Sequence, residues 1–209
     1  MNKKPGLVQK LLLCGFFTFI STPVQGQITP DSTLGSEASK ITPNAIIKGA
    51  NADLINGGAQ RGNNLFHSFS EFNIDNGQKV YFGNPSGVLN ILTRVTGSNA
   101  SNILGTLGVD GAANLFLINP NGILFGQNAS LDLRGSFVGT TANGLQFGNQ
   151  GNFSATNAEA PGLLTINPSA LFFNQINPTA AIVNNSVAPF SGKDPAGFNA
   201  NGLRVANGK

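Results

Sequence analysis

Short apolar runs alternate with Asn- and Gly-rich segments along most of the chain. The runs contain β-branched or aromatic residues, which favour strands, and they lie too close together for the crossover helices of an α/β sheet. No window of about a dozen residues keeps an i, i+3, i+4 apolar pattern. The sequence therefore predicts an all-β fold, with strands at residues 80–82, 88–92, 115–118, 123–125, 131–133, 163–166 and 181–183.

A recurring turn lies between many of these runs. Its Asn can cap the turn through the side chain, its Pro presets φ at the second position, and Gly or Ala ends it. Four copies predict a degenerate repeat whose units stack and bury a shared face. Their irregular spacing leaves both a β-sandwich and stacked coils open, and the richness in Asn and Gly favours coils. The copies are Asn84-Pro85-Ser86-Gly87, Asn119-Pro120-Asn121-Gly122, Asn167-Pro168-Ser169-Ala170 and Asn177-Pro178-Thr179-Ala180.

The two ends of this repeat carry separate expectations. Residues 27–45 contain Pro, Ser and Thr and show no clear strand before Ile46 and Ile47, so we expect this segment to cap the first coil and protect its unpaired backbone. Residues 202–209 read as another strand and turn. We therefore expect a domain truncated at its C-terminal end, with an uncapped coil and partial disorder near residues 190–209.

The first 26 residues have the pattern of a secretory signal peptide. Lys3, Lys4 and Lys10 precede an apolar run at residues 11–20, which is too short to span a bilayer, and Gly26 is small enough for a cleavage site. We expect cleavage between Gly26 and Gln27, which leaves residues 27–209 as one exported domain. Cys14, the only cysteine, would leave with the leader, so the mature chain has no disulfide.

The net charge of +3 also belongs to the leader. Three of the 12 basic side chains are the lysines of the leader, and the leader has no acidic side chain. Residues 27–209 therefore carry nine basic and nine acidic side chains. A nearly neutral chain has no basic stripe for the phosphate contacts that dominate nucleic-acid binding. We therefore expect no nucleic-acid partner.

Three sequence blocks resemble the N-terminal domain of the filamentous haemagglutinin family. The first two are residues 62–74 and 88–97. The third, residues 113–126, contains the motif Asn119-Pro120-Asn121-Gly122-Ile123 and is the most specific. The similarity spans residues 46–140, about half of the mature chain, with weaker agreement to the end.

This resemblance implies two-partner secretion. It implies a right-handed parallel β-helix of the pectin-lyase-like type, with an N-terminal capping segment and hairpins outside the helix. The leader would take the chain through the Sec translocon to signal peptidase, and an outer-membrane β-barrel transporter with periplasmic recognition domains would then export it to the cell surface or the medium. Folding outside the cell would supply the energy coil by coil, and adhesion to host or surface glycans would belong to downstream regions.

Asn119, Pro120, Asn121, Gly122 and Ile123 are the candidate secretion motif, and two interpretations of them stay open. The motif can be recognised by the transporter, or it can be a corner that keeps two strands in register. The family's second tetrapeptide, Asn-Pro-Asn-Leu, has no clear equivalent here, because Asn84-Pro85-Ser86-Gly87 differs at two of four positions. This difference places the chain in another branch of the family.

Enzymatic and glycan-binding functions are the alternatives. A polysaccharide-active β-helix needs grouped carboxylates, and here only the stacking of coils could bring them together. A lone imidazole, His67, cannot hold zinc. We predict no enzyme, metal or cofactor, and three carboxylates in one groove would revive the enzymatic alternative. A glycan-binding module would use exposed aromatic side chains such as Tyr81, Phe147 or Phe198, yet 16 Phe, one Tyr and no Trp suit a dry core better. The carboxylates are scattered along the chain at Asp53, Glu71, Asp75, Asp110, Asp132, Glu159 and Asp194.

Overall fold

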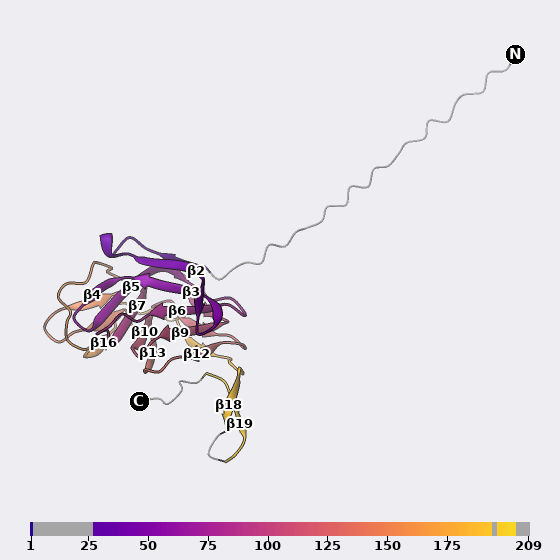
Figure 1. Ribbon diagram of the computed structural model, residues 1–209. Coiled ribbons are helices and arrows are strands. Elements are labelled where there is room, and N and C mark those ends of the chain that lie inside the picture. Colours follow the sequence, from indigo (N-terminus) through magenta and orange to yellow (C-terminus); the bar gives the residue numbers. More distant parts are fainter. Residues whose placement is uncertain (2–26, 194–195, 204–209) are drawn as a thin grey trace.

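The chain winds into stacked β-strand coils that form a solenoid of about three turns (Figure 1). The computed structural model describes Met1, residues 27–193 and residues 196–203. The predicted leader lies outside the described residues, apart from Met1. Of the residues that the structure describes, 49% lie in strands and 2% in helix, so the all-β prediction is confirmed and the stacked coils replace the sandwich.

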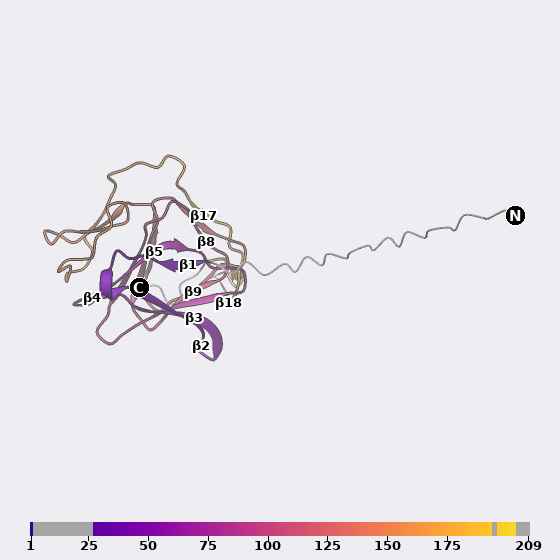
Figure 2. The same cartoon turned by 90° about the horizontal axis from the view of Figure 1, so that it is seen from above.

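Three sheets form the walls of the solenoid. The first coil contributes strands to sheets A and B only, and each of the three coils that follow contributes one strand to each sheet. Figure 2 looks down the stack and shows the roughly triangular outline. The successive strands of each wall pair in parallel. Sheet A contains β5 (Asn64–Phe72), β7 (Asn90–Val95), β10 (Asn114–Ile118) and β13 (Phe137–Thr140); sheet B contains β3 (Ala50–Gly57), β6 (Lys79–Gly83), β9 (Thr106–Asp110) and β12 (Ser130–Asp132); sheet C contains β8 (Ser101–Ile103), β11 (Ile123–Phe125) and β17 (Ile182–Asn184).

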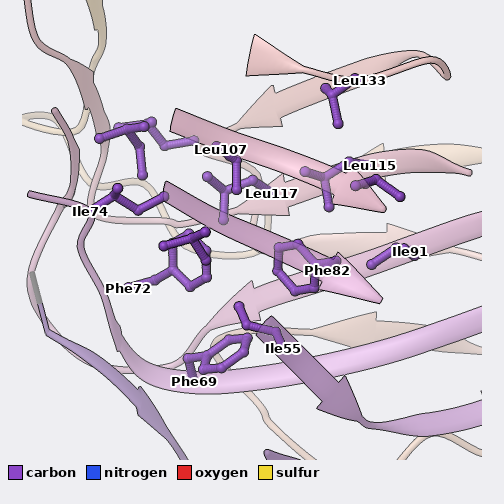
Figure 3. Packing of buried hydrophobic residues seen from close by; sticks show 14 of the residues in the cluster. Ile55, Phe69, Phe72, Ile74, Phe82, Ile91, Leu107, Leu115, Leu117 and Leu133 are labelled. Carbon is purple, nitrogen blue, oxygen red and sulfur yellow. The ribbon is translucent and has the colours of Figure 1, made fainter. Parts of the chain in front are cut away.

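Alternating side chains of the three sheets point inward and fill the solenoid. Figure 3 shows Phe69, Phe82, Leu115 and their neighbours converging on one interior. Leu65, Ile91 and Leu115 are in register on sheet A, so each coil repeats the apolar contact of the coil before it. Because the strands alternate with period two, the same register puts Phe66 and Leu92 on the outer face of sheet A.

The N-terminal segment caps the first coil, as predicted, but it does so with strands that were not predicted. β1 (Ile28–Pro30) pairs antiparallel with β5, and β2 (Ser39–Ile47) pairs antiparallel with β3. β4 (Ala59–Arg61), which follows β3 in the chain, also pairs antiparallel with β5. The short 3₁₀ helix Gly35–Glu37 joins β1 to β2. The expectation of no strand before Ile46 was therefore wrong. The capping strands occupy the free edges of sheets A and B, which is how sheet proteins avoid pairing with other chains.

Residues 141–181, which we call the excursion, leave the fourth coil after β13 and return to it as β17. The excursion contains an antiparallel sheet of β14 (Gly144–Gln146), β15 (Asn152–Ser154) and β16 (Ala170–Phe172). A second hairpin, β18 (Pro189–Lys193) with β19 (Asn199–Asn201), projects from the end of the stack in Figure 1. The expectation of hairpins outside the helix is confirmed.

The predicted strand at residues 163–166 was wrong, since this segment is an irregular part of the excursion. Its backbone groups bond to side-chain amides. Asn64 Nδ2 donates to the carbonyls of Leu164 and Ile166, and Gln150 Oε1 accepts from the amides of Thr165 and Ile166. The other six predicted strands overlap strands of the fold, and their ends differ by at most three residues.

An asparagine ladder runs along the outer face of sheet A where its strands begin. Asn114 Nδ2 donates to Asn90 Oδ1, and Asn90 Nδ2 donates to Asn64 Oδ1 and Asn167 Oδ1. The in-register positions lie 26 residues apart and then 24, and the backbone amide of Ser136 continues the ladder 22 residues further. Successive coils therefore differ in length, although their strands stay in register.

Candidate functional site

The motif Asn119–Ile123 forms the corner between β10 and β11. The amide of Gly122 donates to the carbonyl of Asn119 at 3.1 Å, which closes a turn, and the amide of Asn121 donates to Asn119 Oδ1 at 2.9 Å. Asn and Pro in these positions favour this geometry, as the sequence suggested. The motif thus connects sheet A to sheet C in the third coil.

Asn119 is fully buried and uses every polar group of its side chain within the fold. Its Nδ2 donates to the carbonyl of Asn99 at 3.0 Å and to Ser101 Oγ at 2.9 Å, and its Oδ1 accepts from Asn121. The backbone amide of Asn119 donates to the carbonyl of Thr140. Asn119 therefore links its own corner to the coils on both sides, and its side chain is hidden from any partner of the folded domain.

The remaining motif residues are also mostly enclosed. Pro120 and Gly122 are buried, and Ile123 contributes to the solenoid core. Gly122 has φ +119°, and a Cβ at this position would lie 2.9 Å from the carbonyl oxygen of Ala181, so a side chain would be both strained and obstructed. Only Asn121 is partly exposed, and its Nδ2 donates to the carbonyl of Gly97 at 2.8 Å.

A second Asn-Pro turn, residues 177–180, stacks on the motif in the next coil. Its local bonds match those of the motif, because the amide of Thr179 donates to Asn177 Oδ1 and the amide of Ala180 donates to the carbonyl of Asn177. Asn177 Nδ2 lies 3.4 Å from Asn121 Oδ1. Asn177 is exposed, however, whereas Asn119 is buried. The two turns therefore share a local geometry and differ in their surroundings.

The other two predicted turns differ from this pair. At residues 84–87 the closing bond runs from the amide of Val88 to the carbonyl of Pro85, and Asn84 Oδ1 instead accepts from the amides of Ala112 and Ala113. Residues 167–170 lead into β16 and form no turn. Only one of the three other Asn-Pro copies thus reproduces the corner of the motif.

A groove of about 440 Å³ runs beside the motif, between the corner that joins β10 to β11 and the excursion. Pro120 and Asn121 form part of one wall, and Gln175, Ile176 and Asn177 form part of the other. Ile176 is 91% exposed at its rim. Amide groups, the hydroxyls of Thr96, Ser98 and Thr156, and apolar atoms line the groove. No carboxylate or imidazole lies among its lining residues to activate a hydroxyl for acid–base or nucleophilic chemistry.

Arg94 is a residue whose role the sequence did not reveal. Its guanidinium is fully buried on the outer face of sheet A. Nε donates to Ser68 Oγ, Nη1 to the carbonyl of Ser154, and Nη2 to Thr33 Oγ1 and the carbonyl of Glu159, all within 2.8 Å. Arg94 thus joins the cap, the first two coils and the excursion. The one signal was an arginine close to the apolar residues Ile91, Leu92 and Val95 in the same strand.

The charge of Arg94 is balanced by Asp31 through two hydroxyl groups. Ser68 Oγ and Thr33 Oγ1 each accept from Arg94 and donate to Asp31, with donor–acceptor distances of 2.6–2.8 Å. Burial lowers the pKa of Arg94 to about 10, and the charge of Asp31 opposes this shift, so Arg94 stays protonated at neutral pH. Burial raises the pKa of Asp31, but the hydrogen bonds from Thr33, Thr96 and Ser68 outweigh it and lower the pKa.

The structure gives no support to the alternative functions. In the described part of the chain, no three His, Cys, Asp or Glu side chains lie together as a metal site would require, and Asp194 lies outside it. His67 is fully buried, and its Nδ1 lies 2.9 Å from Ser39 Oγ. Tyr81 and Phe147 are buried and cannot serve as exposed glycan contacts, which agrees with an aromatic core, whereas Phe198 is exposed. No helix in the described residues is long and apolar enough to cross a membrane.

Comparison with known proteins identifies a family. A family model described as the TPS secretion domain matches residues 26–209. A curated relative, the heme/hemopexin-binding protein of Haemophilus influenzae, is 38% identical over 69 residues. That segment makes up 33% of this chain and 7% of the relative, so the chain spans only a small part of the relative's length.

Proposed function

The chain belongs to the TPS secretion domain family, and on that basis we propose that its transporter recognises Asn119–Ile123 in the unfolded chain. The family's domains direct exoproteins across the outer membrane to the cell surface or the medium, and their partner is a dedicated outer-membrane transporter. It is a family of secretion domains and not of enzymes. The proposal concerns which state of this chain the transporter binds.

The burial of Asn119 supports this proposal most directly. A partner that bound the folded domain would reach only Asn121 among the motif side chains, because Asn119 and Ile123 are buried and all polar atoms of Asn119 are bonded internally. Recognition of the whole motif therefore has to precede folding. Folding would then withdraw the motif from the transporter and release the domain.

The experiment compares the motif with its structural counterpart. Asn119→Asp keeps the acceptor for the amide of Asn121 and loses the two donors of Nδ2, and Asn177→Asp makes the same change in the matching turn. Binding of the urea-unfolded chain to the periplasmic part of the transporter is measured, together with urea unfolding of each domain. We expect Asn119→Asp to weaken binding of the unfolded chain at least tenfold and Asn177→Asp to leave it unchanged.

The competing interpretation, a purely structural corner, gives a different result. In that case Asn119→Asp lowers the free energy of unfolding by about 1–3 kcal/mol, since buried donors and acceptors lose their partners, while the unfolded chain binds the transporter as well as wild type. This outcome would remove the proposal. A loss of both stability and binding supports the proposal. Binding is measured on the unfolded chain, so it does not depend on the stability of the folded domain.

We also propose the route to the transporter. Residues 1–26 act as a cleavable leader that is read by the Sec translocon and removed by signal peptidase, so that the exported domain begins at Gln27. In the fold, the carbonyl of Gln27 accepts from the amide of Asn73, which places the start of the exported domain beside the first coil. N-terminal sequencing of the exported protein tests the site, and a start several residues away from Gln27 would contradict it.

The far end of the solenoid supports a role in nucleating further coils. Leu131, Phe137 and Ile182 are in register with the buried residues Leu107, Leu115 and Ile123, yet they are only partly covered. Another coil would bury them and pair with β12, β13 and β17. We propose that adhesion, glycan contacts and any other activity of the full exoprotein lie in such additional regions, and that this domain has no catalytic activity.

A further inference from the structure

The excursion covers the outer face of sheet A over the first three coils. Phe66, Leu92 and Ile118 point outward from β5, β7 and β10, and each is fully buried. They form one apolar cluster with Leu145, Phe147, Phe153 and Leu164 of the excursion. The rings of Phe66 and Phe153 pack edge to face, with centroids 4.8 Å apart. Without the excursion, this face would present a continuous apolar stripe to water.

Polar groups of the early coils depend on the same segment. Asn64 Nδ2 donates to the carbonyls of Leu164 and Ile166, which lie 100 and 102 residues later in the chain. Arg94 donates to the carbonyls of Ser154 and Glu159, which lie 60 and 65 residues later. The amide of Asn64 and the guanidinium of Arg94 would lose these buried partners if the excursion were absent, which adds to the cost of the uncovered apolar stripe.

We infer that the first three coils and the excursion fold as one cooperative unit, so that the domain is not committed to its folded state until residues 145–166 have crossed the membrane. The consequence of this inference for export rests on the proposed function. It replaces coil-by-coil stabilisation by a single late step. The order in which the chain emerges does not matter. The excursion can cover sheet A only when the first three coils and the excursion are on the same side of the membrane.

Leu163 and Leu164 provide a matched pair of variants. Leu164 is 1% exposed and contacts the apolar cluster, whereas its neighbour Leu163 is 78% exposed. Leu164→Ala in the full chain therefore loosens the excursion, and Leu163→Ala controls for the substitution itself. Native-state hydrogen exchange is then read at the backbone amides of Leu92 in β7, Phe116 in β10 and Leu145 in β14.

We expect Leu164→Ala to accelerate exchange at all three amides by the same factor, about 30-fold or more for a buried Leu→Ala change. Leu163→Ala should change none of them by more than about threefold. If exchange increases at Leu145 and stays unchanged at Leu92 and Phe116, the coils are stable without the excursion and the inference is wrong. Should Leu164→Ala fail to fold, Leu164→Val is expected to give the same pattern at about fivefold.

Export provides a second measurement that separates the two proposals. Each variant is expressed with the transporter, and appearance in the medium is followed over time after a pulse of label. Leu164→Ala should leave more slowly than wild type and than Leu163→Ala. Equal rates for the two variants would overturn the late-commitment step, while failure of wild type to leave the cell would overturn the proposed function and not the exchange result.

Discussion

Tyr81 Oη donates a hydrogen bond of 2.7 Å to Asp132 Oδ2 and thereby joins two strands of sheet B that are separated by a third. Between them lies Gly108, which is in register with both residues. Lys48 Nζ also donates to Asp132 Oδ2 at 2.8 Å and lies 5.1 Å above the ring of Tyr81. This group of residues fastens the hairpin of β2 and β3 to the fourth coil across the outer face of the solenoid.

The first prediction concerns the Tyr81 hydroxyl. Burial raises the pKa of Asp132, but the hydrogen bonds from Lys48 and Tyr81 outweigh it and lower the pKa, so the carboxylate is ionised at neutral pH. Tyr81→Phe should lower the free energy of unfolding by about 1–2 kcal/mol, because it removes a hydrogen bond to a charged group. Urea unfolding measures this. Lys48→Met, which removes a half-exposed ion pair, should cost under about 1 kcal/mol; an equal loss in both variants would contradict the interpretation.

Gly108 is required because the ring of Tyr81 lies directly over it. A Cβ at position 108 would lie 2.6 Å from Tyr81 Cδ1 and 2.9 Å from the carbonyl oxygen of Asp132. Gly108→Ala should therefore destabilise the domain by about 1–3 kcal/mol. In a double-mutant cycle, Tyr81→Ala should relieve part of this cost. The double variant should then lose less free energy of unfolding than the sum of the losses in the two single variants. Additive effects would mean that the backbone of β12 is the obstacle.

Replacing Arg94 should be the most damaging of the single changes. Arg94→Met should lower the free energy of unfolding by about 3–5 kcal/mol, since it leaves Asp31 partly buried without its compensating charge and frees two carbonyls of the excursion. Arg94→Lys should recover little, because a lysine cannot reproduce the planar set of donors. Far-UV circular dichroism in urea gives both values. If the lysine variant has a free energy of unfolding close to that of wild type, the positive charge alone is sufficient at this position.

His67 should make the domain less stable in mild acid. Burial lowers the pKa of His67 to about 3, whereas an unfolded histidine titrates near pH 6.5. Between these values the unfolded chain binds a proton that the folded domain excludes, so the free energy of unfolding falls as the pH decreases. From pH 7 to pH 5 we expect a loss of about 2 kcal/mol.

The control for this pH dependence is His67→Gln, which should be nearly independent of pH over the same range. The carboxylates with shifted values, Asp31, Glu37 and Asp132, all have lowered pKa values, so their contribution is lost only below about pH 4.5. Urea unfolding at several pH values separates the two windows. A slope that persists in the glutamine variant would assign it to another group.

The sequence predicted only part of the solenoid walls. Short apolar runs located the wall strands β6, β7, β10, β11, β12 and β17, and the prediction missed β3, β5, β8, β9 and β13, which are interrupted by polar residues or glycine. In β10 and β11, apolar residues lie on either side of an Asn-Pro turn, and β7 and β8 of the preceding coil pair with these two strands in register. The regular spacing that would reveal a repeat is missing, because the coils of 26, 24 and 22 residues differ at their corners. Corners can change length without moving the strands, so a search for a fixed period fails.

The cap and the excursion could not be predicted in the same way. β2 contains Pro43 and Asn44, with Asn44 at φ +56°, and its pairing with β3 is interrupted there. The apolar residues at 163–166 resemble a strand, yet only Leu164 is buried, and the backbone groups of residues 164–166 bond to the side-chain amides of Asn64 and Gln150. Such contacts depend on tertiary structure, as does the burial of Arg94 by residues from four separate segments.

The sequence located the candidate motif, but it did not predict that the motif is buried. The turn chemistry of Asn119 and Pro120 correctly predicted a corner. Its enclosure depends on Thr140 and Ala181 of the next coil, which contact Asn119 and Gly122. Asn177 has nearly the same local sequence and bonds, yet it is exposed, so local sequence alone could not separate the two.

The burial of Asn119, Gly122 and Ile123 also makes this segment a reporter of conformation. An antibody raised against a linear peptide of residues 116–124 needs side chains that the folded domain encloses, so it would bind the chain before folding and lose its epitope afterwards. Labelling intact cells and periplasmic extracts with such an antibody would follow the unfolded population directly, without any change to the protein.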